Sequence, residues 1–169
     1  MALPFLNFIL SFLIALILHE LGHLTAAQIS GVRVTALGLG WGPKLYRRTL
    51  NNVEFQLRLL PLGAFVQMDM NTFRQRSLNK QLFVLSAGIA VNLLLAMLTW
   101  GSLFGVLNLG LAIGNSLPLY QQDGWKGAIV ICRSLLGRTS PIVEWSVTIT
   151  GGVMALVVVT RALLTISGN

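Results

Sequence analysis

Residues 5–28 read FLNFILSFLIALILHELGHLTAAQ, and this stretch decides the class of the protein. Fourteen mostly apolar residues lead directly into His19, Glu20 and His23. At about 1.5 Å per residue, a helix over residues 3–28 crosses a hydrocarbon core of about 30 Å with some tilt. We therefore predict a membrane span. Its three ionisable side chains need an explanation, because a charged group at bilayer depth costs about 2.5–3.5 kcal/mol on insertion scales.

The composition of the whole chain is typical of an integral membrane protein. Hydrophobic residues make up 54% of the 169 residues, charged residues only 10%, and the mean hydropathy is +0.75. Further hydrophobic segments cover about 82–107, 108–137 and 143–164, and the second of these three is broken by NSLPLYQQDGWKG. We therefore expect a mainly α, polytopic protein with about four transmembrane helices, forming a single membrane domain over residues 1–169.

The cysteine count, the N-terminal segment and the distribution of charge further limit the class of membrane protein. The single cysteine, Cys132, excludes an internal disulfide framework. The opening MALPFLNF lacks the basic region and the cleavage site of a signal peptide, so we expect the first span to be retained. The net charge of +7 is concentrated in the connection 31–80, which argues against a nucleic-acid partner and for contact with anionic lipids. The basic residues of this connection are Arg33, Lys44, Arg47, Arg48, Arg58, Arg74, Arg76 and Lys80.

The positive-inside rule places the connection 31–80 in the cytoplasm and both termini outside. We expect the inner (plasma) membrane of a bacterial-type cell. Within the connection, Val53, Phe55, Leu57 and Leu59 alternate with polar residues, the period of a half-buried strand. TLNN offers a turn before this strand, and glycines at 38, 40 and 42 exclude a helix there. The segment 31–70 is therefore predicted to form a small membrane-associated β-sheet between the first two spans.

His19-Glu20-Leu21-Gly22-His23 has the HExxH spacing, and it contains both histidines of the chain. Residues four apart share one face of a helix, so both imidazoles can bind the same zinc ion. Glu20 is rotated about 100° from His19 and can address a zinc-activated water as general base. The two histidines are therefore predicted metal ligands and Glu20 the catalytic residue, with Zn²⁺ as the cofactor.

Zinc in a catalytic site takes a third protein ligand, and the sequence leaves two candidates. Asp123 lies inside a hydrophobic segment beside Gly124 and after Pro118, where the helix should unwind. Unwound backbone at membrane depth is tolerated where it is buried or lines a watery cavity, which hydrolysis also requires. We therefore predict Asp123 as the third ligand. Glu144 remains the alternative, as in zinc proteases that take this ligand from a downstream glutamate.

Four motifs in this order resemble the site-2 protease family of intramembrane zinc metalloproteases. They are HELGH in a span, the pair GLGWGPKLYRR and LRLLPLGAFVQM after it, SAGIAVNLLLA with Gly88 and Asn92, and NSLPLYQQDG. The resemblance implies cleavage of single-span helical substrates within the bilayer, with two His and one Asp on zinc and Glu20 as base. It also implies that Asn92 and Asn115 bind the substrate backbone, with Pro118 and Gly124 shaping the site and the sheet guiding an unwound substrate segment.

The chain departs from the family pattern at several positions. Tyr120 and Gln122 stand where Pro and Leu are frequent, and Ala64 stands where Gly is frequent. No PDZ-like domain interrupts the second and third spans, so the resemblance is to a minimal form. Control over cleavage would then come from a regulatory or complex partner.

Two other function classes fit parts of the sequence. A catalytically idle scaffold or assembly subunit of a membrane complex could keep this fold, although it would have no need of Glu20. A transporter or proton relay could also use intramembrane His, Glu and Asp, but the chain shows no internal repeat of the kind common in transporters.

Overall fold

The computed structural model describes residues 2–137 and 141–166, and it confirms the mainly α fold with a small sheet after the first helix. The chain divides into two compact units, residues 1–113 and 114–169. The elements run in the order α1 (Ala2–Ser30), β1 (Val34–Leu50), β2 (Val53–Met68), α2 (Met70–Arg74), α3 (Leu78–Leu98), α4 (Leu103–Ser116), α5 (Asp123–Leu136) and α6 (Pro141–Ile166).

Three of the described helices are long and apolar enough to cross a membrane: Leu3–Ser30 of α1, Leu78–Leu98 of α3 and Pro141–Val158 of α6. The expected span at 82–107 was wrong in its bounds, because α3 ends at Leu98. Thr99 closes that helix by donating from its hydroxyl to the Leu95 carbonyl, and Gly101 then adopts a φ of +80°. The expected broken span at 108–137 corresponds to α4 and α5, helices of 14 residues on either side of residues 117–122.

In the first unit, α1 and α3 pack through stripes of residues spaced four apart. On α1 the buried stripe is Ala15, His19, His23 and Ala27; on α3 it is Val84, Gly88, Asn92 and Ala96. Such a stripe faces one neighbour because four residues are close to one helical turn. The small residues let the two backbones approach closely, as is usual between membrane helices. Gly22 shows this closeness, since a Cβ there would lie 2.9 Å from the Ala87 carbonyl oxygen.

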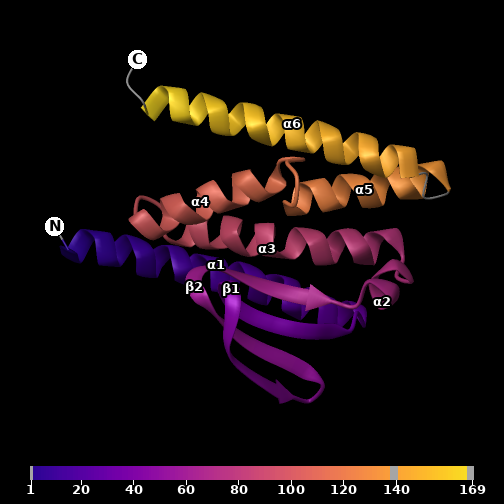
Figure 1. Ribbon diagram of the computed structural model, residues 1–169, viewed down its shortest axis with the longest axis horizontal. Helices are drawn as coiled ribbons and strands as arrows, with labels where there is room; N and C mark the ends of the chain where they lie inside the picture. The colour runs from indigo at the N-terminus through magenta and orange to yellow at the C-terminus, as the bar shows by residue number, and fades with distance from the viewer. Residues whose placement is uncertain (1, 138–140, 167–169) are drawn as a thin grey trace. The chain divides into compact units, whose positions relative to one another are not determined.

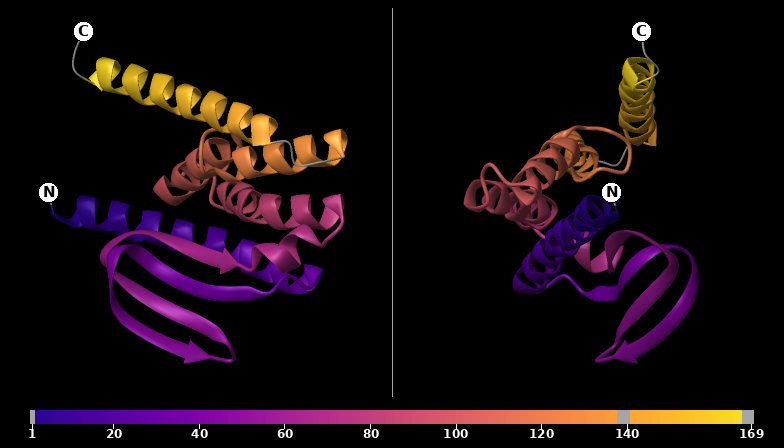
Figure 2. Two further views of the ribbon diagram at one scale, coloured as in Figure 1. Left: turned by 45° about the vertical axis from the view of Figure 1, so that its right-hand side comes forward. Right: turned by 90° about the vertical axis from the view of Figure 1, so that its left-hand side faces the viewer.

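The sheet is an antiparallel pair of long, bent strands that curls beside α1 (Figures 1 and 2). Residues 36–39 pair with 64–67 on one side and with 54–57 on the other, and 54–57 pair in turn with 46–49. The segments 64–67 and 46–49 are thus the two edges of the sheet. Asn51 and Asn52 both have positive φ, as a tight hairpin turn requires, so the predicted turn is confirmed.

The burial along β2 is opposite to that expected for a half-buried strand. Gln56 is buried, whereas Phe55 and Leu57 are 42% and 43% exposed. The Arg58 guanidinium donates to the Gln56 side-chain oxygen at 3.0 and 3.3 Å, which satisfies the buried amide oxygen. The apolar side of the strand is left open because it faces a pocket beside α1.

The second unit contains the short connection 117–122 and the helices α5 and α6. Tyr120 N–H donates to the Gly151 carbonyl at 3.3 Å, and the Tyr120 ring packs edge-on against Trp125. Gly151 is required at this contact, since a Cβ would lie 2.7 Å from the Pro118 carbonyl oxygen. These contacts tie the connection before α5 to the middle of α6.

Candidate metal centre

The two histidines of the HExxH sequence lie one helical turn apart on the buried face of α1. His19 and His23 are only 4% and 5% exposed. Their Nε2 atoms face each other at 3.1 Å, and their rings meet edge-on with an interplanar angle of 79°. The predicted pairing of the two imidazoles is therefore present within one rigid helix.

The opposite nitrogen of each ring is held by α3. His23 Nδ1 donates to the Val84 carbonyl at 2.7 Å, and His19 Nδ1 lies 3.3 Å from Asn92 Oδ1. Because a carbonyl oxygen only accepts, Nδ1 of each ring is the donor in these contacts, and Nε2 is the nitrogen that each ring can offer to a metal. This second layer of contacts is typical of histidines that bind a metal.

The donor pair fits zinc. Two nitrogens bound to one tetrahedral zinc at about 2.0–2.1 Å lie about 3.3 Å apart, close to the 3.1 Å between the two Nε2 atoms. Both Nδ1 atoms are held by α3, which leaves the two closely spaced Nε2 atoms as the nitrogens that can bind one ion. The arrangement is therefore best explained as the protein part of a divalent metal site.

Gly88 leaves the room that such an ion needs. A Cβ at this position would lie 2.5 Å from His23 Nε2 and 2.7 Å from His19 Nε2. Val84, Gly88 and Asn92 follow one another at single helical turns, so one face of α3 holds both rings and keeps the space between them open.

Asn92 is fully buried, and the oxygen and nitrogen of its side-chain amide have different surroundings. Its Oδ1 accepts from His19, while its Nδ2 makes no hydrogen bond among the residues that the structure describes. The sequence predicted a role in binding substrate. The geometry adds a positioning role, because the amide oxygen fixes the orientation and tautomer of His19.

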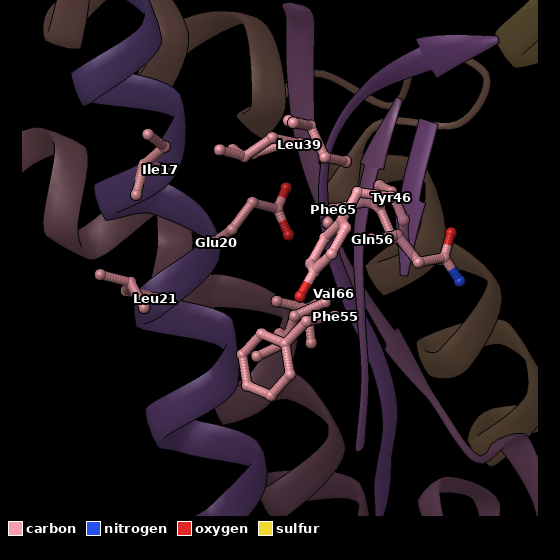
Figure 3. Close-up of a pocket in the computed structure, with 13 residues that line it drawn as sticks. Ile17, Glu20, Leu21, Leu39, Tyr46, Phe55, Gln56, Phe65 and Val66 are labelled. Carbon is pink, nitrogen blue, oxygen red and sulfur yellow. The ribbon is translucent and has the colours of Figure 1, made fainter. Parts of the chain in front are cut away.

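Glu20 points from α1 toward the sheet (Figure 3). Its carboxylate enters a pocket of about 280 Å³ between α1 and the two strands. The pocket is lined from α1 by Ile17, Glu20 and Leu21, and from the sheet by residues 37–39, 46, 55–57 and 64–66. The carboxylate that the sequence predicts as general base thus lies in the wall of an apolar pocket.

The remaining predicted site residues belong to the second unit. Asp123 is the first residue of α5, and Lys126 Nζ donates to its Oδ1 at 2.9 Å. Asn115 is in the last turn of α4, and Pro118 is in the connection that follows. Gly124 is required where it stands, because a Cβ would lie 2.3 Å from the Ser116 carbonyl oxygen.

Glu144, the alternative third ligand, forms an ion pair with Arg133 of α5. That pairing gives the carboxylate a structural role at the start of α6. Two contacts of the site were missed by sequence reasoning, the Val84 carbonyl and the Lys126 ammonium. Lys126 could have been found from its i+3 spacing to Asp123, whereas a backbone carbonyl leaves no signal in a sequence.

Comparison with known proteins matches this site to one family. The sequence profile described as Peptidase family M50 matches residues 7–104, more than half of the chain. Among similar proteins, "Membrane metalloprotease ARASP, chloroplastic" of Arabidopsis thaliana is 34% identical over 116 residues, covering 61% of this chain and 25% of that protein. A Synechocystis protein that carries the provisional name of a zinc metalloprotease is 34% identical over 153 residues, covering 79% and 41%. The chain thus spans less than half the length of these relatives.

Proposed function

Because the chain belongs to peptidase family M50, we propose that it is a zinc-dependent protease that hydrolyses peptide bonds of membrane proteins. The observation that carries this proposal is the histidine pair, with its two Nε2 atoms facing at 3.1 Å over the open space at Gly88. The names of relatives support it, since they describe membrane or zinc metalloproteases.

His19, His23 and Asp123 would hold the zinc ion, two imidazoles and one carboxylate being the donor set of many catalytic zinc sites. The order of the motifs along the chain supports Asp123, as does the engagement of Glu144 by Arg133. When bound, zinc acidifies a coordinated water and polarises the carbonyl of the peptide bond. Lys126 would orient the carboxylate of Asp123 by donating to its Oδ1.

Glu20 supplies the proton transfers of the reaction. Its carboxylate accepts a proton from the attacking water and passes it to the amide nitrogen, which leaves as an amine. Its position on α1, one residue after His19 and turned toward the pocket, keeps it out of the ligand set and next to a space that substrate can enter.

The proposed substrate is a single transmembrane helix that unwinds locally, because a helix keeps its carbonyls in its own hydrogen bonds. The edge segment 64–67 can add an extended peptide as a further strand, with affinity from main-chain hydrogen bonds. Asn115, with Pro118 and Gly124 shaping the backbone beside it, would hold the same strand. Asn92 Nδ2 offers a second amide donor for it.

We further propose that the chain lies in the inner membrane of a bacterial-type cell, with both termini outside and the connection 31–80 on the cytoplasmic side. The eight basic residues of that connection support this orientation, and they suit contact with anionic lipid headgroups. A regulatory protein that trims or presents the substrate is the expected partner.

The test is cleavage of a single-span substrate by the purified full chain in detergent or vesicles. We expect cleavage that a chelator abolishes and added zinc restores. Glu20→Gln should lose at least about 100-fold in rate while its bound zinc is unchanged. Chelator-insensitive cleavage would contradict the proposal, and a Glu20→Gln variant that fully supports cellular function would favour the scaffold.

A further inference from the structure

The pocket into which Glu20 points lies wholly within the first unit. Its walls come from α1 and from both strands (Figure 3). The lining residues are Ile17, Glu20 and Leu21 of α1, residues 37–39 and Tyr46 of β1, and residues 55–57 and 64–66 of β2. Most of these side chains are apolar, and several of them remain open: Leu39 is 37% and Leu57 43% exposed. Apolar walls that stay open next to a polar reactive group are characteristic of a binding site.

The far wall of the pocket is held in place by a chain of contacts. The Phe65 ring lies directly over Gly38, where a Cβ would come within 2.4 Å of the ring carbon Cζ. The Arg58 guanidinium stacks on the same ring at 4.6 Å from its centre. Arg58 in turn donates to the buried side chain of Gln56. The ring therefore has a fixed position before any ligand arrives, which lowers the entropic cost of binding.

The volume of about 280 Å³ limits the occupant. This is just below the range of about 300–1,000 Å³ that is usual for drug-sized ligands, so the pocket has room for one large side chain. The polarity of the lining groups limits the kind of occupant further. Nearly every lining group is apolar, and the one carboxylate, Glu20, repels an acidic side chain.

We propose that this pocket is a specificity subsite that takes one large apolar side chain, such as Leu or Phe, from the substrate residue next to the cleaved bond. The proposal rests on the proposed function, because it uses Glu20 as the marker of the reacting peptide. Burying the side chain between α1 and the sheet brings the neighbouring peptide bond to that carboxylate. Substrates of this protein therefore carry a large apolar residue at one fixed position beside the scissile bond.

Leu57 and Leu59 provide a matched pair of test positions. They are the same residue type on β2, they are 43% and 52% exposed, and only Leu57 lines the pocket. The substrate is a single-span peptide with Ala, Leu, Phe, Trp or Asp next to the cleaved bond, which mass spectrometry of the products locates. We expect the unmodified chain to prefer Leu or Phe over Ala by at least about tenfold in kcat/KM, and to cleave the Asp peptide worst.

Leu57→Ala should shift this preference toward Trp by about threefold or more, while Leu59→Ala should keep it within about twofold. A preference that does not change in Leu57→Ala, or that changes equally in Leu59→Ala, overturns the subsite. So does equal cleavage of the Ala and Phe peptides by the unmodified chain.

A second measurement does not depend on cleavage. In a Glu20→Gln, Cys132→Ser background, a cysteine is placed at position 57 or, as control, at position 59. A substrate peptide with one cysteine next to the cleaved bond should form a disulfide with position 57 at least about fivefold faster than with position 59. Moving the substrate cysteine by one residue should remove this difference, because alternate side chains of an extended strand point to opposite sides.

The two measurements separate the possible failures. Position-specific crosslinking without any cleavage contradicts the protease and keeps the subsite. Cleavage with equal crosslinking at both positions overturns the subsite and keeps the protease. Equal crosslinking that falls when a long-chain lipid is added identifies a lipid tail as the occupant, which also overturns the proposal.

Discussion

Replacing Gly88 by alanine is the sharpest structural test of the metal centre. The added Cβ would lie 2.5 Å from His23 Nε2, whereas ordinary van der Waals contact begins at 3.4 Å. The ring would have to retreat by about 0.9 Å, the difference between the two values. It cannot do so freely, because the Val84 carbonyl holds its other nitrogen at 2.7 Å. Zinc–ligand distances tolerate only about 0.2 Å, so the donor pair should no longer fit one ion.

We expect Gly88→Ala to weaken zinc binding by at least about 100-fold, or about 2.8 kcal/mol. The assay is competition with a fluorescent zinc chelator on the purified full chain, with helix content followed by circular dichroism. Gly110→Ala is the matched control, since it makes the same change within a helix of the first unit where a Cβ meets nothing within 4 Å. The control should bind zinc normally and be slightly more stable. A Gly88→Ala variant with unchanged zinc affinity would show that the histidine pair does not need the space at Gly88 to bind the metal.

Three further predictions concern the metal ligands, their supporting contact on α3 and an ion pair in the sheet. Asp123→Ala should lose bound zinc as measured by elemental analysis, whereas Glu144→Ala should keep it; the reverse result would make Glu144 the third ligand. Asn92→Ala removes the acceptor that fixes the first histidine, so the zinc affinity measured by chelator competition should fall about 10- to 100-fold. In the sheet, a hydrogen bond from Lys44 holds the pKa of Glu54 below its ordinary value of 4.5. The pair therefore stabilises the sheet at neutral pH and stops doing so as the pH falls through that lowered pKa. Lys44→Gln should raise the pKa of Glu54 measured by NMR.

The placement of the HExxH side chains could be predicted from the sequence because it depends only on the geometry of one helix. Spacing of four residues on a helix places His19 and His23 on one face whatever the rest of the fold does. The same helical geometry predicted that Glu20 lies on a different face of the helix from the two histidines. In the structure its carboxylate points toward the sheet. The tight turn at Asn51 and Asn52 was also local, since these residue types tolerate positive φ.

What the sequence could not reveal depends on tertiary contacts. Gly88 leaves space beside the histidines only because of how α3 is rotated about its own axis where it packs on α1. The periodicity of the sequence does not determine that rotation. The inverted burial around Gln56 arises because Arg58 satisfies its amide and because the apolar side of β2 faces a pocket. The end of α3 at Leu98 was missed because the apolar pattern resumes at Leu103, where α4 begins, after only four intervening residues.

Zinc-edge X-ray absorption on the purified full chain, loaded with one equivalent of zinc, tests the metal centre itself. We predict two imidazole nitrogens and further oxygen ligands at about 2.0–2.1 Å, with the imidazole signal lost in a variant that lacks both His19 and His23. A chain that binds no zinc, or whose zinc spectrum is the same without these two histidines, would rule out a zinc site on α1.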